Sequence, residues 1–112
     1  MVKEHYNPDR GDITWITFNP QVGHEQTGRR PAIVISPMAY NSKTHLAIFC
    51  PITSKIKGYP FEVTLPESCD IQGVILADQI KSLDWTKRKA EYVCKVSIDV
   101  LEETMSKIKT LL

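Results

Sequence analysis

The sequence alternates short runs of β-branched and aromatic residues with clusters of Gly, Pro, Asn and Asp, a pattern typical of a protein built from short strands. Phe61–Leu65 alternates apolar and polar residues, as in a strand with one face in water, whereas Ala32–Ile35 is apolar throughout and is predicted to be central. The spacing predicts a small, mostly antiparallel barrel. The predicted strands are Ile13–Phe18, Ala32–Ser36, Leu46–Ile52, Phe61–Leu65, Gly73–Leu76 and Glu91–Val96.

After residue 97 the apolar residues recur at helical spacing, which predicts a C-terminal helix. Ser97 can serve as its N-cap, and Glu103 can pair with Lys107 one turn later. A shorter helical turn is predicted within residues 37–44. The C-terminal helix should be amphipathic, with its apolar stripe packed against the core or in a dimer. That stripe is Leu101, Met105, Ile108 and Leu112.

The length of 112 residues suits a single domain that spans residues 1–112. Apolar residues make up 42% and charged residues 24%, a balance that excludes disordered, collagen-like and coiled-coil chains. The longest apolar stretches fall far short of the roughly 18 residues that cross a bilayer. The N-terminal residues lack the apolar segment of a secretory signal. We therefore expect a cytoplasmic protein with no membrane contact.

The cysteines and histidines do not have the spacing of metal ligands. Cys50, Cys69 and Cys94 are an odd number with wide gaps, which fits reduced thiols, and Cys50 and Cys94 are expected in the core. The histidines are isolated, and His24 begins a segment that misses the HExxH zinc motif at its last position. We expect neither a metal nor a cofactor.

Positive charge is concentrated in one segment, although the totals nearly balance. Fourteen Lys and Arg against thirteen Asp and Glu leave a net charge of +1, which alone gives no argument for nucleic acid. However, no acidic residue occurs from Gln26 to Phe61, and that segment holds five Lys and Arg as well as Tyr40 and Tyr59. Cations mixed with aromatic rings suit single-stranded nucleic acid. The same residues also fit solvated loop charges and core rings, so both interpretations stay open.

The segment from residue 23 to residue 31 holds residue types suited to phosphodiester cleavage. A metal-free cleavage needs a base for the attacking hydroxyl, an acid for the leaving oxygen and a cation for the developing charge. His24, Glu25 and Arg30 are such types. Pro31 favours an extended backbone at Arg30, and alternation then points Arg29 and Arg30 to opposite sides. By itself the pattern is a weak signal, because a Glu and an Arg beside a turn, here Glu25 and Arg30, more often form a surface ion pair.

Several segments occur in one order along nearly the whole chain. The two longest are Arg10-Gly-Asp-Ile-Thr-Trp-Ile-Thr-Phe-Asn-Pro and Gly23-His-Glu-Gln-Thr-Gly-Arg-Arg-Pro-Ala-Ile-Val-Ile-Ser-Pro. The others are Tyr40-Asn41, Pro51-Ile-Thr-Ser, Lys57-Gly-Tyr-Pro-Phe-Glu-Val and Gly73-Val-Ile-Leu-Ala-Asp-Gln-Ile-Lys-Ser. This ordered set closely resembles the MazF/PemK (Kid) family of toxin endoribonucleases. The MazF branch is the more similar, chiefly through Lys57–Val63 and Ala77–Ser82.

The resemblance implies an SH3-like small barrel of the CcdB/Kid/MazF type, mainly β with a C-terminal helix, that forms a homodimer. It also implies the toxin of a type II toxin-antitoxin system, an endoribonuclease that cleaves single-stranded RNA, including mRNA, at specific sequences without metal. In the family, the ribose 2′-hydroxyl attacks its own phosphodiester and leaves 2′,3′-cyclic phosphate and 5′-hydroxyl ends. Translation and growth stop until a cognate antitoxin binds through an acidic, flexible C-terminal tail.

Three residues match catalytic positions of the family. Arg30 matches the catalytic arginine, expected as charge stabiliser or acid, and Thr53 matches the threonine that holds the scissile phosphate. Glu25 matches a glutamate implicated in MazF-type enzymes and is assigned as general base. His24 and Asp78 match the PemK/Kid branch, which also uses an arginine two residues before the aspartate. Leu76 stands there instead, so we expect His24 to help bind RNA and Asp78 to be either structural or near the RNA.

The predicted RNA-binding residues are His24, Arg29, Lys55, Lys57, Tyr59, Asp78, Gln79 and Lys81. Gln79 and Lys81 suit either an RNA contact or a capped strand end. Residues 19–29 and 54–60 are expected to form mobile loops that close over the RNA. Two other functions stay open: a CcdB-like toxin that poisons DNA gyrase without nuclease activity, and an SH3-like module that binds nucleic acid or protein without catalysis.

Overall fold

The computed structural model describes residues 6–18, 28–66 and 70–112 of the chain. Within them lies a seven-stranded antiparallel sheet with one short helix and one C-terminal helix. The strands are β1 (Asp12–Phe18), β2 (Gly28–Val34), β3 (Leu46–Thr53), β4 (Glu62–Thr64), β5 (Val74–Leu76), β6 (Lys81–Asp84) and β7 (Glu91–Lys95); the helices are α1 (Met38–Thr44) and α2 (Ile98–Lys109). The prediction of a mainly β protein with a C-terminal helix is therefore confirmed.

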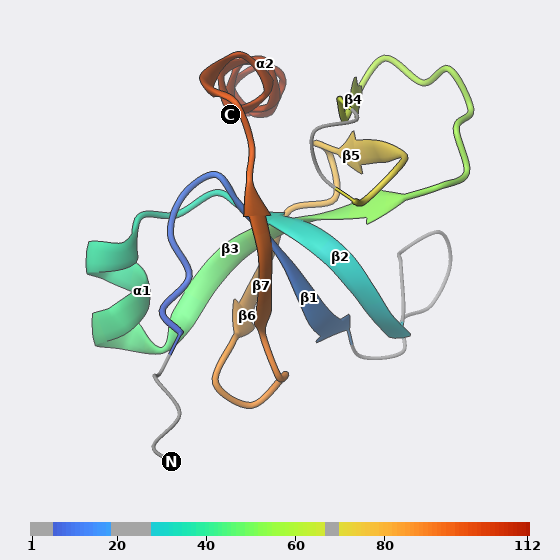
Figure 1. Ribbon diagram of the computed structural model, residues 1–112. Coiled ribbons are helices and arrows are strands. Elements are labelled where there is room, and N and C mark those ends of the chain that lie inside the picture. Colours follow the sequence, from blue (N-terminus) through green and yellow to red (C-terminus); the bar gives the residue numbers. More distant parts are fainter. Residues whose placement is uncertain (1–5, 19–27, 67–69) are drawn as a thin grey trace.

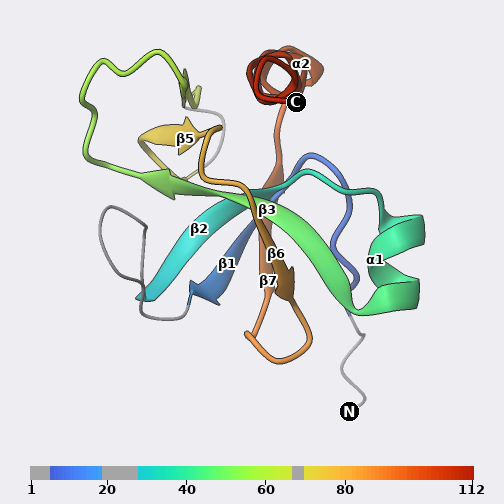
Figure 2. The same cartoon turned by 180° about the vertical axis from the view of Figure 1, so that it is seen from behind.

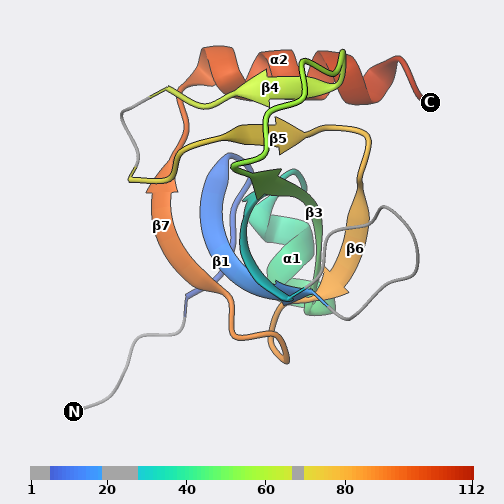
Figure 3. The ribbon, with the colours of Figure 1, turned by 90° about the vertical axis from the view of Figure 1, so that its right-hand side faces the viewer.

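The strands follow the order β4-β5-β3-β2-β1-β7. β6 is not part of this linear order and pairs with β3. The sheet is strongly curled, and in Figure 3 β7 and β6 lie on either side of the central strands β1 and β3. No pairing within the described ranges joins β4 to β7, so the sheet forms a small, open barrel-like shape. α2 runs along β4, with β5 on the far side of that strand (Figure 3). α1 lies beside β3, on the side away from β4 and β5 (Figure 1), as Figure 2 shows from behind.

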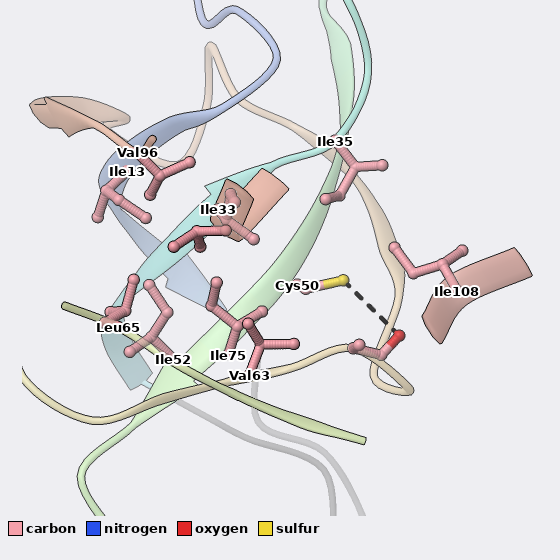
Figure 4. Close-up of a cluster of buried hydrophobic side chains, with 12 residues drawn as sticks. Ile13, Ile33, Ile35, Cys50, Ile52, Val63, Leu65, Ile75, Val96 and Ile108 are labelled. Atoms are coloured by element: carbon pink, nitrogen blue, oxygen red, sulfur yellow. Dashed lines mark hydrogen bonds between the residues drawn. The ribbon is translucent and has the colours of Figure 1, made fainter. Parts of the chain in front are cut away.

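The core lies on both faces of the curled sheet. Figure 4 shows the larger cluster, in which strand residues such as Ile33, Ile52 and Ile75 meet Ile108 of α2. A second cluster on the opposite face gathers around Phe49 and Ala32. Ile33, Val34 and Ala32 are all fully buried, which confirms that this run is a central strand.

α2 begins at the predicted N-cap. The Ser97 side chain accepts a hydrogen bond from the backbone N–H of Val100, and Glu103 and Lys107 form the expected ion pair at 3.9 Å. The apolar stripe differs from the prediction at its end, because Leu112 lies beyond the helix and is 93% exposed. Leu101 and Met105 flank the core, while the fully packed row is Val100, Thr104 and Ile108. In the described part of the chain, no helix is long and apolar enough to cross a membrane.

Two features depart from the sequence-based expectations. β6 has no predicted counterpart, since Lys-Ser-Leu-Asp shows little β-propensity, and pairing with β3 over Leu46–Phe49 makes it a strand.

Cys50 is buried and free, as expected. Cys94 is disulfide-bonded, so the expectation of reduced thiols is wrong for this residue. Distance along the chain does not show which sulfurs the fold brings together.

Candidate active site

The pairing of β2 with β3 places Arg30 beside Thr53. Ala32 is opposite Pro51 in the antiparallel register, and two residues further along each strand lie Arg30 and Thr53. Because side chains two apart in a strand share a face, Arg30 and Thr53 project from the same face of the sheet as Ala32 and Pro51. Two residues that are 23 positions apart in the sequence therefore meet at the same end of two strands.

Arg30 and Thr53 line a cavity of about 640 Å³ at this end of the sheet. The other residues come from the connection between β3 and β4, from β4, and from the segment that runs from β5 to β6. They are Lys55, Lys57, Tyr59, Glu62, Leu76, Asp78, Gln79, Ile80 and Lys81. Among the described residues, the cavity thus collects the predicted catalytic residues Arg30 and Thr53 and every predicted RNA-binding residue except Arg29.

Among the described residues, four cationic and two acidic side chains give the cavity a positive balance. Both acids accept hydrogen bonds from the β3–β4 connection. Glu62 accepts the backbone N–H groups of Lys57 and Gly58 at 3.0 and 3.1 Å. Asp78 accepts the Tyr59 hydroxyl, and this hydrogen bond, together with the nearby carboxylate charge, raises the pKa of Tyr59 above its usual value. Both carboxylates of the described lining therefore hold the β3–β4 connection.

Thr53 is held from two sides. It is only 6% exposed, and its Oγ1 accepts the backbone N–H of Lys55 at 3.2 Å. Gly73, which precedes β5, packs directly on the Thr53 main chain: a Cβ atom there would lie 2.2 Å from the Thr53 carbonyl oxygen. Only glycine permits this approach, so Gly73 helps to set the position of the Thr53 backbone.

The wall of the cavity beside Asp78 is apolar. Leu76 is buried, lines the cavity and offers neither a proton nor a charge to a phosphate. Cys50 packs below, with its Sγ 3.9 Å from the Ala77 carbonyl oxygen (Figure 4). Burial, reinforced by the Asp78 charge, raises the pKa of the Cys50 thiol to about 12, so it is a packing group rather than a nucleophile.

Arg29 points away from the cavity, as the alternation of the strand predicts. Its guanidinium contacts the β6–β7 turn, with the Lys89 carbonyl oxygen at 2.8 Å and Glu91 Oε1 at 3.1 Å. It also lines a second cavity of about 520 Å³ with Trp15 and Arg30. The structure therefore gives Arg29 a role in holding the turn and does not bring it to the first cavity.

Two predicted site residues, His24 and Glu25, lie outside the described residues. Within the described ranges, no group of three or more His, Cys, Asp or Glu side chains forms a set that could hold a metal ion.

Comparison with known proteins identifies the family. A family model described as "PemK-like, MazF-like toxin of type II toxin-antitoxin system" matches residues 9–112. The chain is 45% identical over 107 residues to the endoribonuclease toxin MazF of Escherichia coli (strain K12), covering 96% of each chain. The chain belongs to the family of PemK-like and MazF-like toxins. The resemblance noted from its sequence is thus confirmed.

Solved structures of the family share the fold. A crystal structure of MazF from Deinococcus radiodurans matches with a TM-score of 0.92 and 53% identity, over 96% of this chain and 97% of that one. A structure of MazE-MazF from the same organism matches with a TM-score of 0.86 and 53% identity, over 96% of both chains.

Two members of the site, Glu62 and Gly73, have no distinctive sequence pattern. Glu62 was not singled out, because one carboxylate at the start of a short strand has many possible surface roles. Gly73 begins a predicted strand and one of the segments that carry the family resemblance, but neither pattern gives it a role in the site. Its role in the site comes from its φ of 128° and from its contact with Thr53. Both depend on the pairing of β3 with β5, which the sequence alone does not show.

Proposed function

We propose that this protein is the toxin of a type II toxin-antitoxin system and acts as a sequence-specific endoribonuclease on single-stranded RNA. Cleavage of mRNA would stop translation and growth. The observation that carries the proposal is the cavity in which Arg30 and Thr53 meet three lysines, in a chain of the MazF-like family. The curated relatives from Escherichia coli are named endoribonucleases.

The proposed reaction is a transesterification without metal or cofactor. The ribose 2′-oxygen forms a bond to the phosphorus while the bond to the 5′-oxygen breaks, which leaves a 2′,3′-cyclic phosphate and a 5′-hydroxyl. A base takes the proton of the 2′-hydroxyl, and an acid gives a proton to the leaving 5′-oxygen. Charge grows on the non-bridging oxygens meanwhile, so a fixed cation beside them lowers the barrier.

Arg30 and Thr53 suit the phosphate. The Arg30 guanidinium is planar and positively charged, which suits it to stabilise the phosphate oxygens. Its proposed alternative role as the acid for the leaving 5′-oxygen comes from the family resemblance. Thr53 already accepts the Lys55 N–H through its Oγ1, so its own hydroxyl proton is available to a phosphate oxygen. Glu25 remains the proposed general base.

The other residues of the cavity suit the rest of the RNA strand. Lys55, Lys57 and Lys81 are placed to attract neighbouring phosphates, and the exposed ring of Tyr59 offers a face on which a base can stack. Gln79 can read a base edge, and Asp78 acts through Tyr59. His24 and Arg29 remain proposed contacts further along the strand. These contacts would select the recognised sequence.

The proposed partners follow from the same surface. The cationic cavity would bind the acidic, flexible tail of a cognate antitoxin in place of RNA, and the 53% identical MazF from Deinococcus radiodurans has been crystallised as MazE-MazF. As in the resemblance drawn above, we propose a homodimer that works in the cytoplasm.

Thr53→Ala is expected to slow cleavage roughly 10- to 100-fold, since one hydrogen bond to a charged group contributes about 1.5–3 kcal/mol. Thr53→Ser should restore most of the rate because it keeps the hydroxyl. Circular dichroism should show a native fold in both variants. An unfolded Thr53→Ala protein would instead mean that Thr53 is structural.

The proposed activity is tested with purified protein, single-stranded RNA and an excess of EDTA. We expect cleavage at defined sites, with a matched duplex left intact. Cleavage that disappears under chelation would contradict the mechanism. A protein that leaves RNA intact but traps gyrase on cut DNA would be a CcdB-like toxin, and one that binds RNA without cutting it would be a binding module.

A further inference from the structure

Three proposed RNA contacts come from a segment without regular structure. Residues 54–61 join β3 to β4 and carry Lys55, Lys57 and Tyr59 into the cavity. Lysine side chains and a glycine give such a segment much conformational freedom, and ordering it on RNA would weaken binding. The structure instead shows the segment attached to the rest of the site at three points.

Glu62 makes the first attachment. Its two carboxylate oxygens accept one backbone N–H each, from Lys57 at 3.0 Å and from Gly58 at 3.1 Å. Its own N–H donates to the Tyr59 carbonyl oxygen at 3.0 Å. Gly58 has a φ of 74°, so the chain turns sharply here, and both N–H groups reach the same carboxylate. One side chain therefore fixes the backbone of both Lys57 and Gly58.

The other two attachments come from α2 and from the segment between β5 and β6. Lys107 of α2 donates from its Nζ to the Pro60 carbonyl oxygen at 2.5 Å, and Glu103 lies beside the same ammonium group at 3.9 Å. The Tyr59 hydroxyl bonds to Asp78 inside the cavity. The C-terminal helix thus contacts the segment that supplies cations to the site.

We propose that Glu62 is a positioning residue that preorganises residues 54–61 for RNA, with Lys107 as a second, weaker anchor. This inference rests on the proposed function, because it concerns how Lys57 and Tyr59 meet the RNA. Glu62 acts through the segment and touches neither the RNA nor the reacting phosphate.

The charge of Glu62 makes the proposal sharply testable. A carboxylate in a cavity that binds phosphates repels them, so removing its charge should by electrostatics alone lower the KM for RNA. Preorganisation predicts the opposite sign. In Glu62→Gln, the side chain keeps its size and shape, and its amide oxygen can still accept one of the two backbone N–H groups. The amide nitrogen is a donor and cannot accept the other, so one of the two anchoring hydrogen bonds is lost.

The experiment measures the steady-state cleavage of a short single-stranded RNA in EDTA by wild type, Glu62→Gln and Glu102→Gln. Glu102 is an exposed glutamate of α2 outside the cavity, so its variant controls for the loss of one charge. We expect the KM to rise about tenfold in Glu62→Gln, with kcat within about threefold of wild type, because Arg30 and Thr53 stay in place. The control should match wild type. An unchanged or lower KM in Glu62→Gln would overturn the proposal.

Amide hydrogen exchange followed by NMR tests the anchoring itself. Protection of the Lys57 and Gly58 amides should fall in Glu62→Gln and stay unchanged in Glu102→Gln. Lys107→Met should raise the KM by a smaller factor, while Lys109→Met, two residues along the same helix, should not. Unchanged protection of these two amides in Glu62→Gln would refute the anchoring, whether or not the wild-type protein cuts RNA. A wild-type protein that cuts no RNA would count against the proposed function and would leave the anchoring by Glu62 untouched.

Discussion

Arg30→Ala should reduce the rate of RNA cleavage about a thousandfold and leave the fold intact. Removing one preorganised donor from a developing oxyanion typically costs 10²–10³ in rate, and a charged guanidinium beside a phosphate belongs at the upper end of that range. Arg30 lies near the start of β2, where the strand borders the cavity, and belongs to neither hydrophobic cluster, so we expect the core to keep its packing. The measurement is single-turnover cleavage of a short RNA, with circular dichroism as the check on folding.

Two variants make this result specific. Arg30→Lys keeps the charge but loses the planar fork, so its rate should fall between wild type and Arg30→Ala. Arg88→Ala removes an arginine outside the cavity whose Nη1 donates to the Thr17 carbonyl oxygen, and it should cleave at close to the wild-type rate. If Arg30→Ala cleaved as fast as wild type, Arg30 would have no part in the chemistry.

Gly73→Ala should destabilise the protein by about 3 kcal/mol or more. The new Cβ would lie 2.2 Å from the Thr53 carbonyl oxygen, and Gly73 also has a φ of 128°, a conformation that L side chains rarely adopt. Backbone strain of this kind costs about 1–3 kcal/mol, and overpacking adds a similar amount. The clash displaces the main chain of Thr53, so cleavage should also slow in whatever protein remains folded.

The control is Gly28→Ala, whose Tm is compared with the Tm of Gly73→Ala in thermal unfolding. Gly28 also has a positive φ, of 78°, but a Cβ atom there would meet no atom of the described residues within 4 Å. Strain alone should then cost about 1 kcal/mol, and each kcal/mol shifts the Tm by roughly 4–8 °C in a domain of up to about 100 residues. Equal Tm losses in Gly73→Ala and Gly28→Ala would mean that the contact with Thr53 is unimportant.

Local patterns predicted most of the elements of this fold. The apolar runs marked β1, β3 and β7 to within a residue or two, and Ser97 marked the start of α2. β2 starts four residues earlier than predicted, because pairing with β1 extends over the polar residues Arg29 and Arg30. β6 was missed for the same reason: its strand conformation comes from pairing with β3, not from its own residues.

The candidate site was predicted in part. Residue types and the family resemblance pointed to Arg30, Thr53 and the lysines. The alternation of the strand explains why Arg30 and not Arg29 lines the first cavity, although both line the second. The supporting contacts were not predictable. The Glu62 hydrogen bonds, the approach of Gly73 to Thr53 and the reach of Lys107 to Pro60 all depend on how β4, β5 and α2 pack together.

The charge distribution also acquires a structural meaning. The acid-free segment from residue 26 to residue 61 ends at Glu62, the carboxylate that holds the backbone of this segment. The net charge of +1 therefore does not reflect the charge of the cavity, where the described lining holds four cations and two acids. Both acids accept hydrogen bonds from the segment that carries Lys55 and Lys57.

The most direct test of the account is to map the ends that the protein makes in a pool of total RNA treated in EDTA. We expect 5′-hydroxyl ends next to 2′,3′-cyclic phosphates, all within one short recurrent sequence, and none of these ends with Arg30→Ala. Ends carrying a 5′-phosphate, cuts that require a divalent metal, or the same ends from Arg30→Ala would contradict it.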